Sequence, residues 1–237
     1  MSSENNLSRR RFLQATGGVA AAGALAGCAG GDGGQDETTT TTQTTTGGDG
    51  GPSGPQLNLI NSTIDTFDPI AAADTASGRV IQQVFDPLTN YKNGTTSVQN
   101  LLADSYEVSD DFTTYTFTIH PDATFHNGDD VTANDVLYSF ERLAASKNSR
   151  RARFILDVLQ LSHETDGEGN YVSGSMAIEA PDEDTFKITM DSAFHATLSV
   201  LAYSSFAAVP EGIVGDIEGY DGEMEYSTFA QDEPIGC

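Results

Sequence analysis

A stretch from Ala29 to Pro55 separates the N-terminal segment from the part of the chain that can fold. It consists mainly of Gly, Thr, Asp and Gln and has no periodic spacing of apolar residues. Such a composition buries too little apolar surface to offset the chain entropy lost on folding. We therefore expect residues 28–55 to be a disordered linker, which as a flexible coil spans about 30 Å. Residues 56–237 remain as a folded domain large enough to bury a core.

The residues before this linker have the layout of an export signal, not of a folded element. Arg9 and Arg10 precede a Phe-Leu pair and an apolar run rich in Ala and Gly, a pattern typical of the twin-arginine signal. The run ends in Leu-Ala-Gly before Cys28, which resembles a lipobox, so residues 1–27 are expected to be removed and Cys28 to be lipidated. The run is too short and too poor in Leu and Ile for a membrane span of about 20 residues. A structural role for Cys28 within the signal helix is the alternative.

The cysteine content and the charge of the chain limit the classes of protein to which it can belong. The only other cysteine is Cys237, so a lipidated Cys28 leaves the domain without a disulfide framework. The chain has 35 acidic against 11 basic residues and a formal net charge of −24, which argues against nucleic-acid binding because that requires a basic surface. Acidic residues spread along the chain favour a surface adapted to high salt, typical of a halophile. An acidic site for cations is the lesser alternative.

The spacing of apolar residues in the folded domain predicts both helices and strands. Strands are predicted at 56–61, 101–108 and 114–119, and a hairpin at 176–190. Helices are predicted at 77–87, after a capping box formed by Thr132 and Asp135, and from Ala193 to Ser204. Helices and strands alternate without a strict rhythm, so we expect an α/β domain with a mixed sheet.

Three stretches resemble the dipeptide- and oligopeptide-binding lipoproteins known as family 5 extracellular solute-binding proteins. The most specific runs from Leu101 to Arg142 and contains Tyr-Thr-Phe, Phe-His-Asn-Gly and Thr-Ala-Asn-Asp-Val-Leu-Tyr-Ser-Phe-Glu-Arg in the order of the family. The others are Phe67-Asp68-Pro69 with the segment 84–88, and Ala180-Pro181-Asp182 with the terminal segment 233–236. The chain departs from the family at residues 119–122, where a basic Leu-Arg pair is usual.

This resemblance implies a particular architecture and role. The chain would be a partial first lobe of a two-lobed, periplasmic-binding-protein-like fold of type II, truncated at its C-terminal side, in which the lobes close over a ligand. It would act as a monomeric receptor on the extracellular face of the membrane, without cofactor or enzymatic activity. Its partners would be a peptide or similar small solute and the permease subunits of an ABC importer, with nickel chelates and oligosaccharides as variant ligands.

Two other classes remain as alternatives. One is a secreted, membrane-anchored hydrolase, which the lack of a His-Glu-x-x-His, paired-Cys or Gly-x-Ser-x-Gly motif disfavours. The other is a non-functional fragment of a binding protein. The adjacent Glu141 and Arg142 are predicted to form a surface or structural ion pair.

In a two-lobed binder the loops at strand ends face the cleft, and this selects the ligand-binding candidates. They are polar residues after the first strand and near the end of the last predicted helix: Ser62, Thr63, Asp65, Tyr203 and Ser204. Each is also a common turn or cap residue.

Two kinds of accessory site were weighed as well. His120, His126, Asp129 and Asp130 carry metal-ligating groups, but the His-Asn-Gly-Asp sequence favours a turn, so no metal site is predicted. Asn61 and Asn93 begin N-glycosylation sequons on an exported chain, and Asn93, next to a glycine, is the better acceptor.

Overall fold

The computed structural model describes residues 62–237. The linker, the signal segment and the strand predicted at 56–61 lie outside these described residues. Contacts between residues group the chain into a unit ending at Gln56 and a folded unit from Leu57 onward. Among residues 62–237, no helix has the length and apolarity needed to cross a bilayer.

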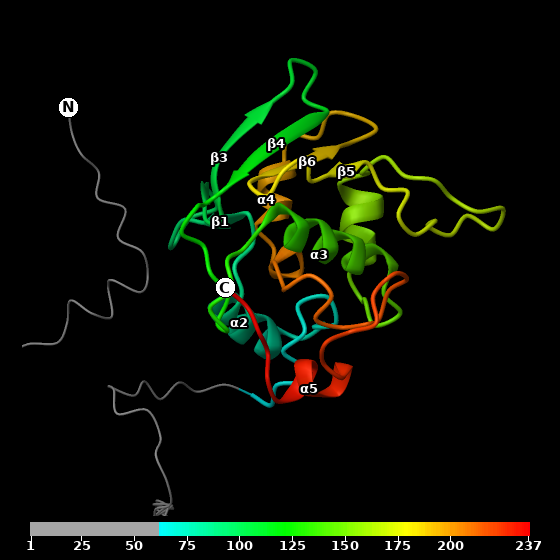
Figure 1. The fold of residues 1–237 in the computed structure, drawn as a ribbon. Coiled ribbons are helices and arrows are strands. Elements are labelled where there is room, and N and C mark those ends of the chain that lie inside the picture. Colours follow the sequence, from blue (N-terminus) through cyan, green and yellow to red (C-terminus); the bar gives the residue numbers. More distant parts are fainter. Residues whose placement is uncertain (1–61) are drawn as a thin grey trace, which may run out of the picture. The chain divides into compact units, whose positions relative to one another are not determined.

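Helices and short strands alternate through the described part (Figure 1). In chain order they are α2 Thr75–Val84, β1 Thr89–Tyr91, β2 Val98–Asn100, β3 Ala103–Val108, β4 Thr114–Ile119, α3 Ala133–Ala145, the π-helical turn η1 Phe154–Val158, β5 Ile178–Glu179, β6 Thr185–Thr189, α4 Thr197–Leu201, the 3-10 turn η2 Ser204–Phe206 and α5 Tyr226–Gln231.

Four strands form the main sheet, in the order β3-β4-β6-β5, and each neighbouring pair is antiparallel. Phe117 of β4 lies opposite Phe186 of β6, and both side chains are fully buried. Their burial follows from the alternation of β4, which places Tyr115, Phe117 and Ile119 in the core. A second sheet pairs β1 with β2, and the one parallel contact described is the Val214–Met224 bridge. The predicted α/β class is confirmed, but within residues 62–237 both sheets are antiparallel instead of mixed.

Helix α3 lies beneath the sheet and carries two buried faces. One face is apolar and packs on the sheet, where the ring of Phe140 meets that of Phe186 at a centroid distance of 4.9 Å. The predicted cap is present, because the Asp135 carboxylate accepts hydrogen bonds from the Thr132 backbone N–H (2.7 Å) and hydroxyl (2.8 Å). The other face is polar and meets the segment 209–216. Its members recur at helical spacing: Asp135, Tyr138, Ser139 and Arg142.

Two predicted helices have different bounds from those expected. Helix α2 begins at Thr75 instead of Ser77, because Asp74 accepts the Ser77 backbone N–H (2.8 Å) as an N-cap. The helix predicted from Ala193 to Ser204 is wrong at both ends, since α4 covers only Thr197–Leu201.

The chain leaves α4 early because the residues that follow are used in pairing. Tyr203 is extended, at φ −78° and ψ 140°. After the short turn η2, Ala207 pairs with Pro87 and the Ala208 N–H donates to the Asp86 carbonyl (3.1 Å). These contacts join the segment after α4 to the end of α2.

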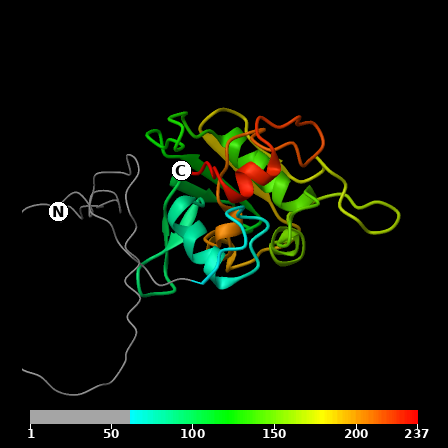
Figure 2. The same cartoon turned by 90° about the horizontal axis from the view of Figure 1, so that it is seen from below.

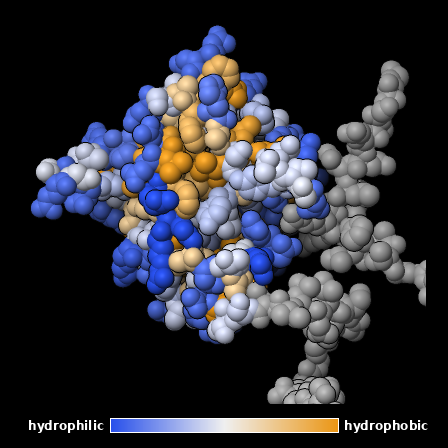
Figure 3. Space-filling view, turned by 180° about the vertical axis from the view of Figure 1, so that it is seen from behind, coloured by the Kyte–Doolittle hydropathy of each residue, from blue (hydrophilic) through white to orange (hydrophobic). Residues whose placement is uncertain are grey.

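The apolar core falls into two groups, one between the sheet and α3 and the other around α2, α5 and the segment 209–217. Seen from below, α2 and α5 flank the loop that precedes α2 (Figure 2). Two hydrogen bonds fix this loop: Phe67 N–H donates to the Ala230 carbonyl (2.8 Å), and Asp65 N–H donates to the Ser77 hydroxyl (2.9 Å). On the face opposite to that of Figure 1, hydrophobic residues form a patch bordered by hydrophilic ones (Figure 3).

Candidate functional site

A buried ion network centred on Arg142 joins three segments that are distant in sequence. The Arg142 guanidinium donates to both carboxylate oxygens of Asp68 (2.9 and 2.8 Å) and to both of Asp216 (2.8 and 3.0 Å). The three side chains are 1%, 0% and 4% exposed. Paired forks of this kind are directional as well as strong. The network therefore fixes the loop before α2 and the segment before α5 on α3.

Asp216 has further donors that keep it ionised. The Ser146 hydroxyl (2.6 Å) and the Asn148 amide (3.0 Å) both donate to it. Burial acts to raise the pKa of Asp216, but hydrogen bonds and the charge of Arg142 outweigh burial and hold the pKa below its ordinary value of 3.8.

The prediction of an ion pair between Glu141 and Arg142 is wrong. Consecutive helical residues point about 100° apart, and Glu141 faces a different loop from Arg142. Its carboxylate accepts the Tyr171 hydroxyl (2.6 Å), the Ser173 hydroxyl (3.1 Å) and the Gly174 N–H (2.7 Å). Glu141 therefore anchors the loop between η1 and β5, while Arg142 organises the opposite side of α3.

A hollow of about 580 Å³ adjoins the Arg142 network. Its polar lining comes from the loop before α2, the segment after α3, and α5: Asp65, Thr66, Lys147, Asn148, Arg150, Tyr226, Ser227 and Gln231. The size is within the range of small-molecule sites. Two other hollows of similar size also border Lys147, but neither contains a residue that the sequence had singled out. The hollow at Asp65 is the best candidate for a ligand site.

The backbone on both sides of this hollow is held in place. The Asp65 carbonyl accepts from the Gln231 side-chain amide (2.9 Å), and the Arg150 N–H donates to the Ile70 carbonyl (3.0 Å). The Tyr226 hydroxyl stays protonated near neutral pH, because burial and the charge of Asp68 raise its pKa to about 12. The hollow is therefore built on backbone segments held by hydrogen bonds, and its lining includes both acidic and basic side chains.

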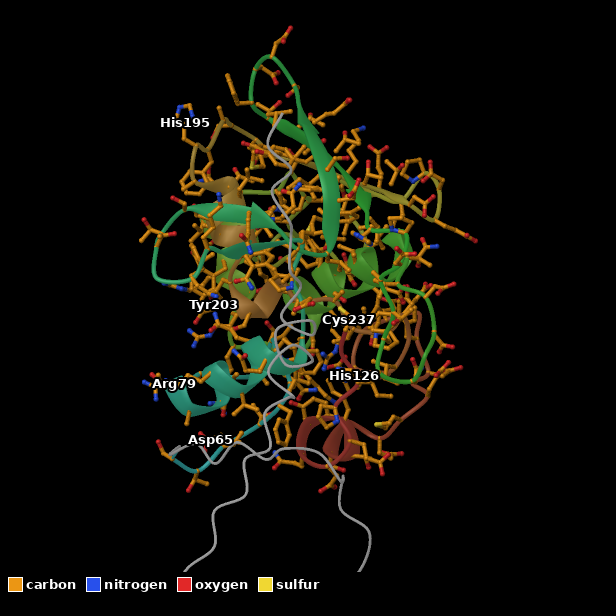
Figure 4. All side chains as sticks on the ribbon, turned by 90° about the vertical axis from the view of Figure 1, so that its left-hand side faces the viewer. Asp65, Arg79, His126, His195, Tyr203 and Cys237 are labelled. Atoms are coloured by element: carbon orange, nitrogen blue, oxygen red, sulfur yellow. The ribbon has the colours of Figure 1, made fainter. Side chains whose placement is uncertain are left out.

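The five ligand candidates from the sequence do not form one group. Ser62 and Thr63 are exposed on the loop before Asp65, and only Asp65 lines the hollow. The ring of Tyr203 packs against that of Phe154 in a tilted arrangement, at a centroid distance of 5.1 Å. Figure 4 shows Asp65 and Tyr203 separated by α2, from which Arg79 projects.

Ser204 is not among the residues that line this hollow either. Its side chain is buried, with 8% exposed, and it begins the turn η2. The ligand role of Ser204 stays a prediction, as do those of Ser62, Thr63 and Tyr203. None of these four residues lines the hollow with Asp65.

The His126 segment forms the predicted turn. Gly128 has a positive φ of 96°, and the Gly128 N–H donates to the Phe125 carbonyl (3.0 Å). His126 holds the C-terminal segment, since its N–H donates to the Gly236 carbonyl (2.8 Å) and its ring Nδ1 accepts the Gly236 N–H (3.3 Å). His126 and Cys237 accordingly lie close together in Figure 4. Within residues 62–237, no group of three or more His, Cys, Asp or Glu side chains could hold a metal ion.

Modification sites fall partly within the described chain. Asn93 is exposed in the turn between β1 and β2, where Gly94 has a φ of 73°. Arg9, Arg10, Cys28 and Asn61 lie outside the described residues.

Several residues of the site were missed from the sequence. Asp216 carries no local signal, and for Asp68 the Phe-Asp-Pro segment was recognised but its role was not, because their partner Arg142 is 74 residues away from each. Arg150 and Lys147 could have been found, since the segment 147–153 holds four basic residues of a chain that has only 11: Lys147, Arg150, Arg151 and Arg153.

Comparison with known proteins identifies the class. Residues 97–237, more than half of the chain, match the bacterial extracellular solute-binding proteins, family 5 Middle. The chain belongs to this family. Residues 6–26 match the signal sequence of the twin-arginine translocation pathway.

Curated relatives agree with this membership. The chain is 30% identical over 144 residues to the glutathione-binding protein GsiB of Pectobacterium atrosepticum, covering 61% of this chain and 25% of the relative. It is 26% identical over 185 residues to the dipeptide-binding protein DppE of Bacillus subtilis, covering 77% of this chain and 33% of the relative. The chain thus spans between a quarter and a third of the length of these two relatives.

The fold is similar to that of Haemophilus influenzae OppA in complex with the peptide RPPGFSPFR. The TM-score is 0.61 at 23% identity, covering 73% of this chain and 32% of the other. The described residues therefore have the fold of part of a periplasmic peptide-binding protein, and the predicted partial first lobe is confirmed.

Proposed function

We propose that this chain is part of the receptor subunit of an ABC importer, which captures peptides or similar small solutes and delivers them to membrane permease subunits. The observation that carries the proposal is the family match over residues 97–237. Relatives named for binding glutathione and dipeptides, and a similar structure holding a nonapeptide, favour peptides as the solute class.

The geometry of the described residues supports capture of a small solute. The hollow at Asp65 has the size of a small-molecule site and a polar lining on a fixed backbone. Binding proteins need groups that are complementary to the solute, and a lining with hydroxyl, amide and charged side chains offers such groups.

We further propose a lipid-anchored receptor on the extracellular face of the membrane. The twin-arginine signal supports export, and the Leu-Ala-Gly-Cys sequence ending at Cys28 supports lipidation. The linker at 28–55 would let the monomeric domain turn freely above the membrane. The acidic composition fits a halophilic, archaeal source.

The proposed capture is tested by heating the full-length protein with a panel of peptides, sugars and metal complexes. A ligand that binds the folded state raises Tm, by an amount that grows with its concentration relative to Kd. We expect peptides to raise Tm and to be recovered unchanged. Turnover of a panel member without a rise in Tm would favour the hydrolase alternative and contradict the proposal.

The proposed anchor is tested by replacing Cys28 with Ser. The variant lacks the thiol that would carry the lipid, so we expect export without membrane retention, and the protein in the soluble fraction of the culture. Cys237→Ser is the matched control and should stay with the membrane fraction. Unchanged retention of Cys28→Ser would refute lipidation at this residue.

A further inference from the structure

The chain contains two Asn-Gly pairs, Asn93-Gly94 and Asn127-Gly128. A glycine has no side chain to shield its backbone nitrogen and moves freely between conformations, so this nitrogen can reach the Cγ atom of the preceding asparagine. Such pairs are chemically labile, because the attack releases the amide group of the asparagine as ammonia. Both pairs lie in exposed turns, and φ is 73° at Gly94 and 96° at Gly128. Exposure and local sequence therefore do not distinguish the two pairs.

Hydrogen bonds hold the reacting groups of Asn127-Gly128 in place. The Asn127 side-chain amide donates to the Asp129 carboxylate (2.5 Å), and the Asn127 side-chain oxygen accepts the Asp129 N–H (3.1 Å). The Gly128 N–H donates to the Phe125 carbonyl (3.0 Å). An attack of the Gly128 nitrogen on Asn127 has to break these contacts, each of which costs free energy.

The reacting groups of Asn93-Gly94 are held by no such contacts. Within residues 62–237, neither the Asn93 side-chain amide nor the Gly94 N–H has a hydrogen-bond partner. The turn is closed by its other residues, since the Lys92 N–H donates to the Ser97 carbonyl (2.8 Å) and the Thr95 N–H donates to the Lys92 carbonyl (3.0 Å). An attack of the Gly94 nitrogen on Asn93 therefore breaks no hydrogen bond of the described chain.

We propose that Asn93 is a site of spontaneous deamidation and that the fold protects Asn127 from the same reaction. The Gly94 backbone nitrogen forms a bond to Cγ of Asn93, the bond from Cγ to Nδ2 breaks, and ammonia leaves with the proton that the Gly94 nitrogen gives up. Water then opens the resulting cyclic imide at either of its two carbonyl groups. The products are aspartate and isoaspartate, and in isoaspartate the backbone runs through the side-chain carbon. Water is the only other reactant.

The reaction competes with the glycosylation expected at the same residue. A glycan would be attached to Nδ2 of Asn93, which is the atom that deamidation removes. Neither aspartate nor isoaspartate offers this nitrogen, so the reaction destroys the sequon at residues 93–95. Deamidation would thus turn an unglycosylated Asn93 into a residue that can no longer be glycosylated.

The chain should stay folded after Asn93 has reacted. The strand before the turn is tied to α4 by side-chain contacts, because the Thr89 hydroxyl donates to the Leu198 carbonyl (2.8 Å) and the Tyr91 hydroxyl donates to the Ser199 carbonyl (2.6 Å). These contacts do not involve the turn. We therefore expect the added charge, and in isoaspartate the added backbone carbon, to have local effects.

The test follows both asparagines in the full-length, unglycosylated protein during incubation at mildly alkaline pH, in enough salt to keep it folded. Digestion and mass spectrometry give the converted fraction of each residue, and chromatography separates aspartate from isoaspartate. We expect Asn93 to convert about tenfold or more faster than Asn127, a factor that corresponds to the loss of one or two hydrogen bonds. Asp129→Ala is the matched variant, because the exposed Asp129 holds the Asn127 amide. It should speed the conversion of Asn127 and leave that of Asn93 unchanged.

The same measurement in guanidinium chloride separates the effect of the fold from that of the local sequence. Unfolding removes the contacts of Asn127, so both asparagines should then convert at similar rates. Equal rates in the folded protein, or faster conversion of Asn127 than of Asn93, would overturn the proposal. A preference for Asn93 that persists in the unfolded chain, or an Asn127 rate unaffected by Asp129→Ala, would overturn the protection by the fold.

Discussion

Arg142 is the residue on which the described fold depends most. It is buried at 1% exposure between two carboxylates that come from different ends of the described chain. A buried ion pair contributes little net stability compared with an apolar replacement of the whole set. Removal of one member is different, because the remaining charges stay buried without compensation.

Replacement of Arg142 by Met should therefore destabilise the protein by about 3–5 kcal/mol at pH 7. Urea unfolding of the two proteins measures the difference. Arg79→Met is the control, since Arg79 is exposed on α2 and such a surface change should stay within about 0.5 kcal/mol. Equal stability of Arg142→Met and the unaltered protein would contradict the role of the network.

The same measurement has an expected pH dependence. The pKa of Asp216 is lowered in the folded state, where the donors and charge of Arg142 outweigh its burial. Its contribution to stability is then full above the pKa of the unfolded chain, about 3.9, and is lost as the pH falls through the lower folded value. The stability difference caused by Arg142→Met should shrink in this acidic window, and a difference independent of pH would point to packing alone.

Helix α3 is the element that connects the fold to the site. Its polar face fixes the segment 209–216 through backbone groups as well as through Asp216. The Tyr138 hydroxyl donates to the Val214 carbonyl (2.5 Å) and accepts the Val214 N–H (3.2 Å). Burial raises the pKa of Tyr138 to about 12, so the hydroxyl keeps its proton at neutral pH.

Replacement of Tyr138 by Phe should leave both backbone groups of Val214 without this partner. We expect a loss of about 1–3 kcal/mol in the free energy of unfolding and faster hydrogen exchange at the Val214 amide. Tyr106→Phe is the matched control, because Tyr106 is 38% exposed. Unchanged protection of Val214 in Tyr138→Phe would show that other contacts position the segment.

The spacing of residues along the sequence predicted α3 and the strands well, because their formation depends on residues that are close together in the chain. The alternation of β4 and the capping box of α3 are short-range signals, and the structure confirms both. Helix α4 was predicted too long, since its end is set by the pairing of Ala207 with Pro87, 120 positions apart, which no local pattern records.

The site was predicted less well because it is assembled from remote segments. Asp65 was identified from its place after the first predicted strand, and it does line the hollow. Its neighbours Arg150 and Gln231 come from other elements and were not proposed. The polar residues of α3 at helical spacing, from Asp135 to Arg142, were a signal of a second buried face that the apolar pattern obscured.

At the scale of the whole molecule, the chain spans only part of the length of the proteins that it resembles. The chain spans 25% of GsiB and 32% of the OppA structure to which it is similar. Its described surface carries an apolar patch with a hydrophilic border (Figure 3), a feature common at interfaces. The family, the export signal and the hollow at Asp65 are the observations behind the proposed role as a receptor that captures solutes outside the cytoplasm.

The most direct test of this account is a calorimetric titration of the full-length protein with the peptide that raises Tm most. The account predicts saturable binding with one peptide per protein, a negative heat-capacity change from buried apolar surface, and intact peptide after the titration. No saturable heat with any peptide of the panel, or peptide cleaved during the titration, would contradict it.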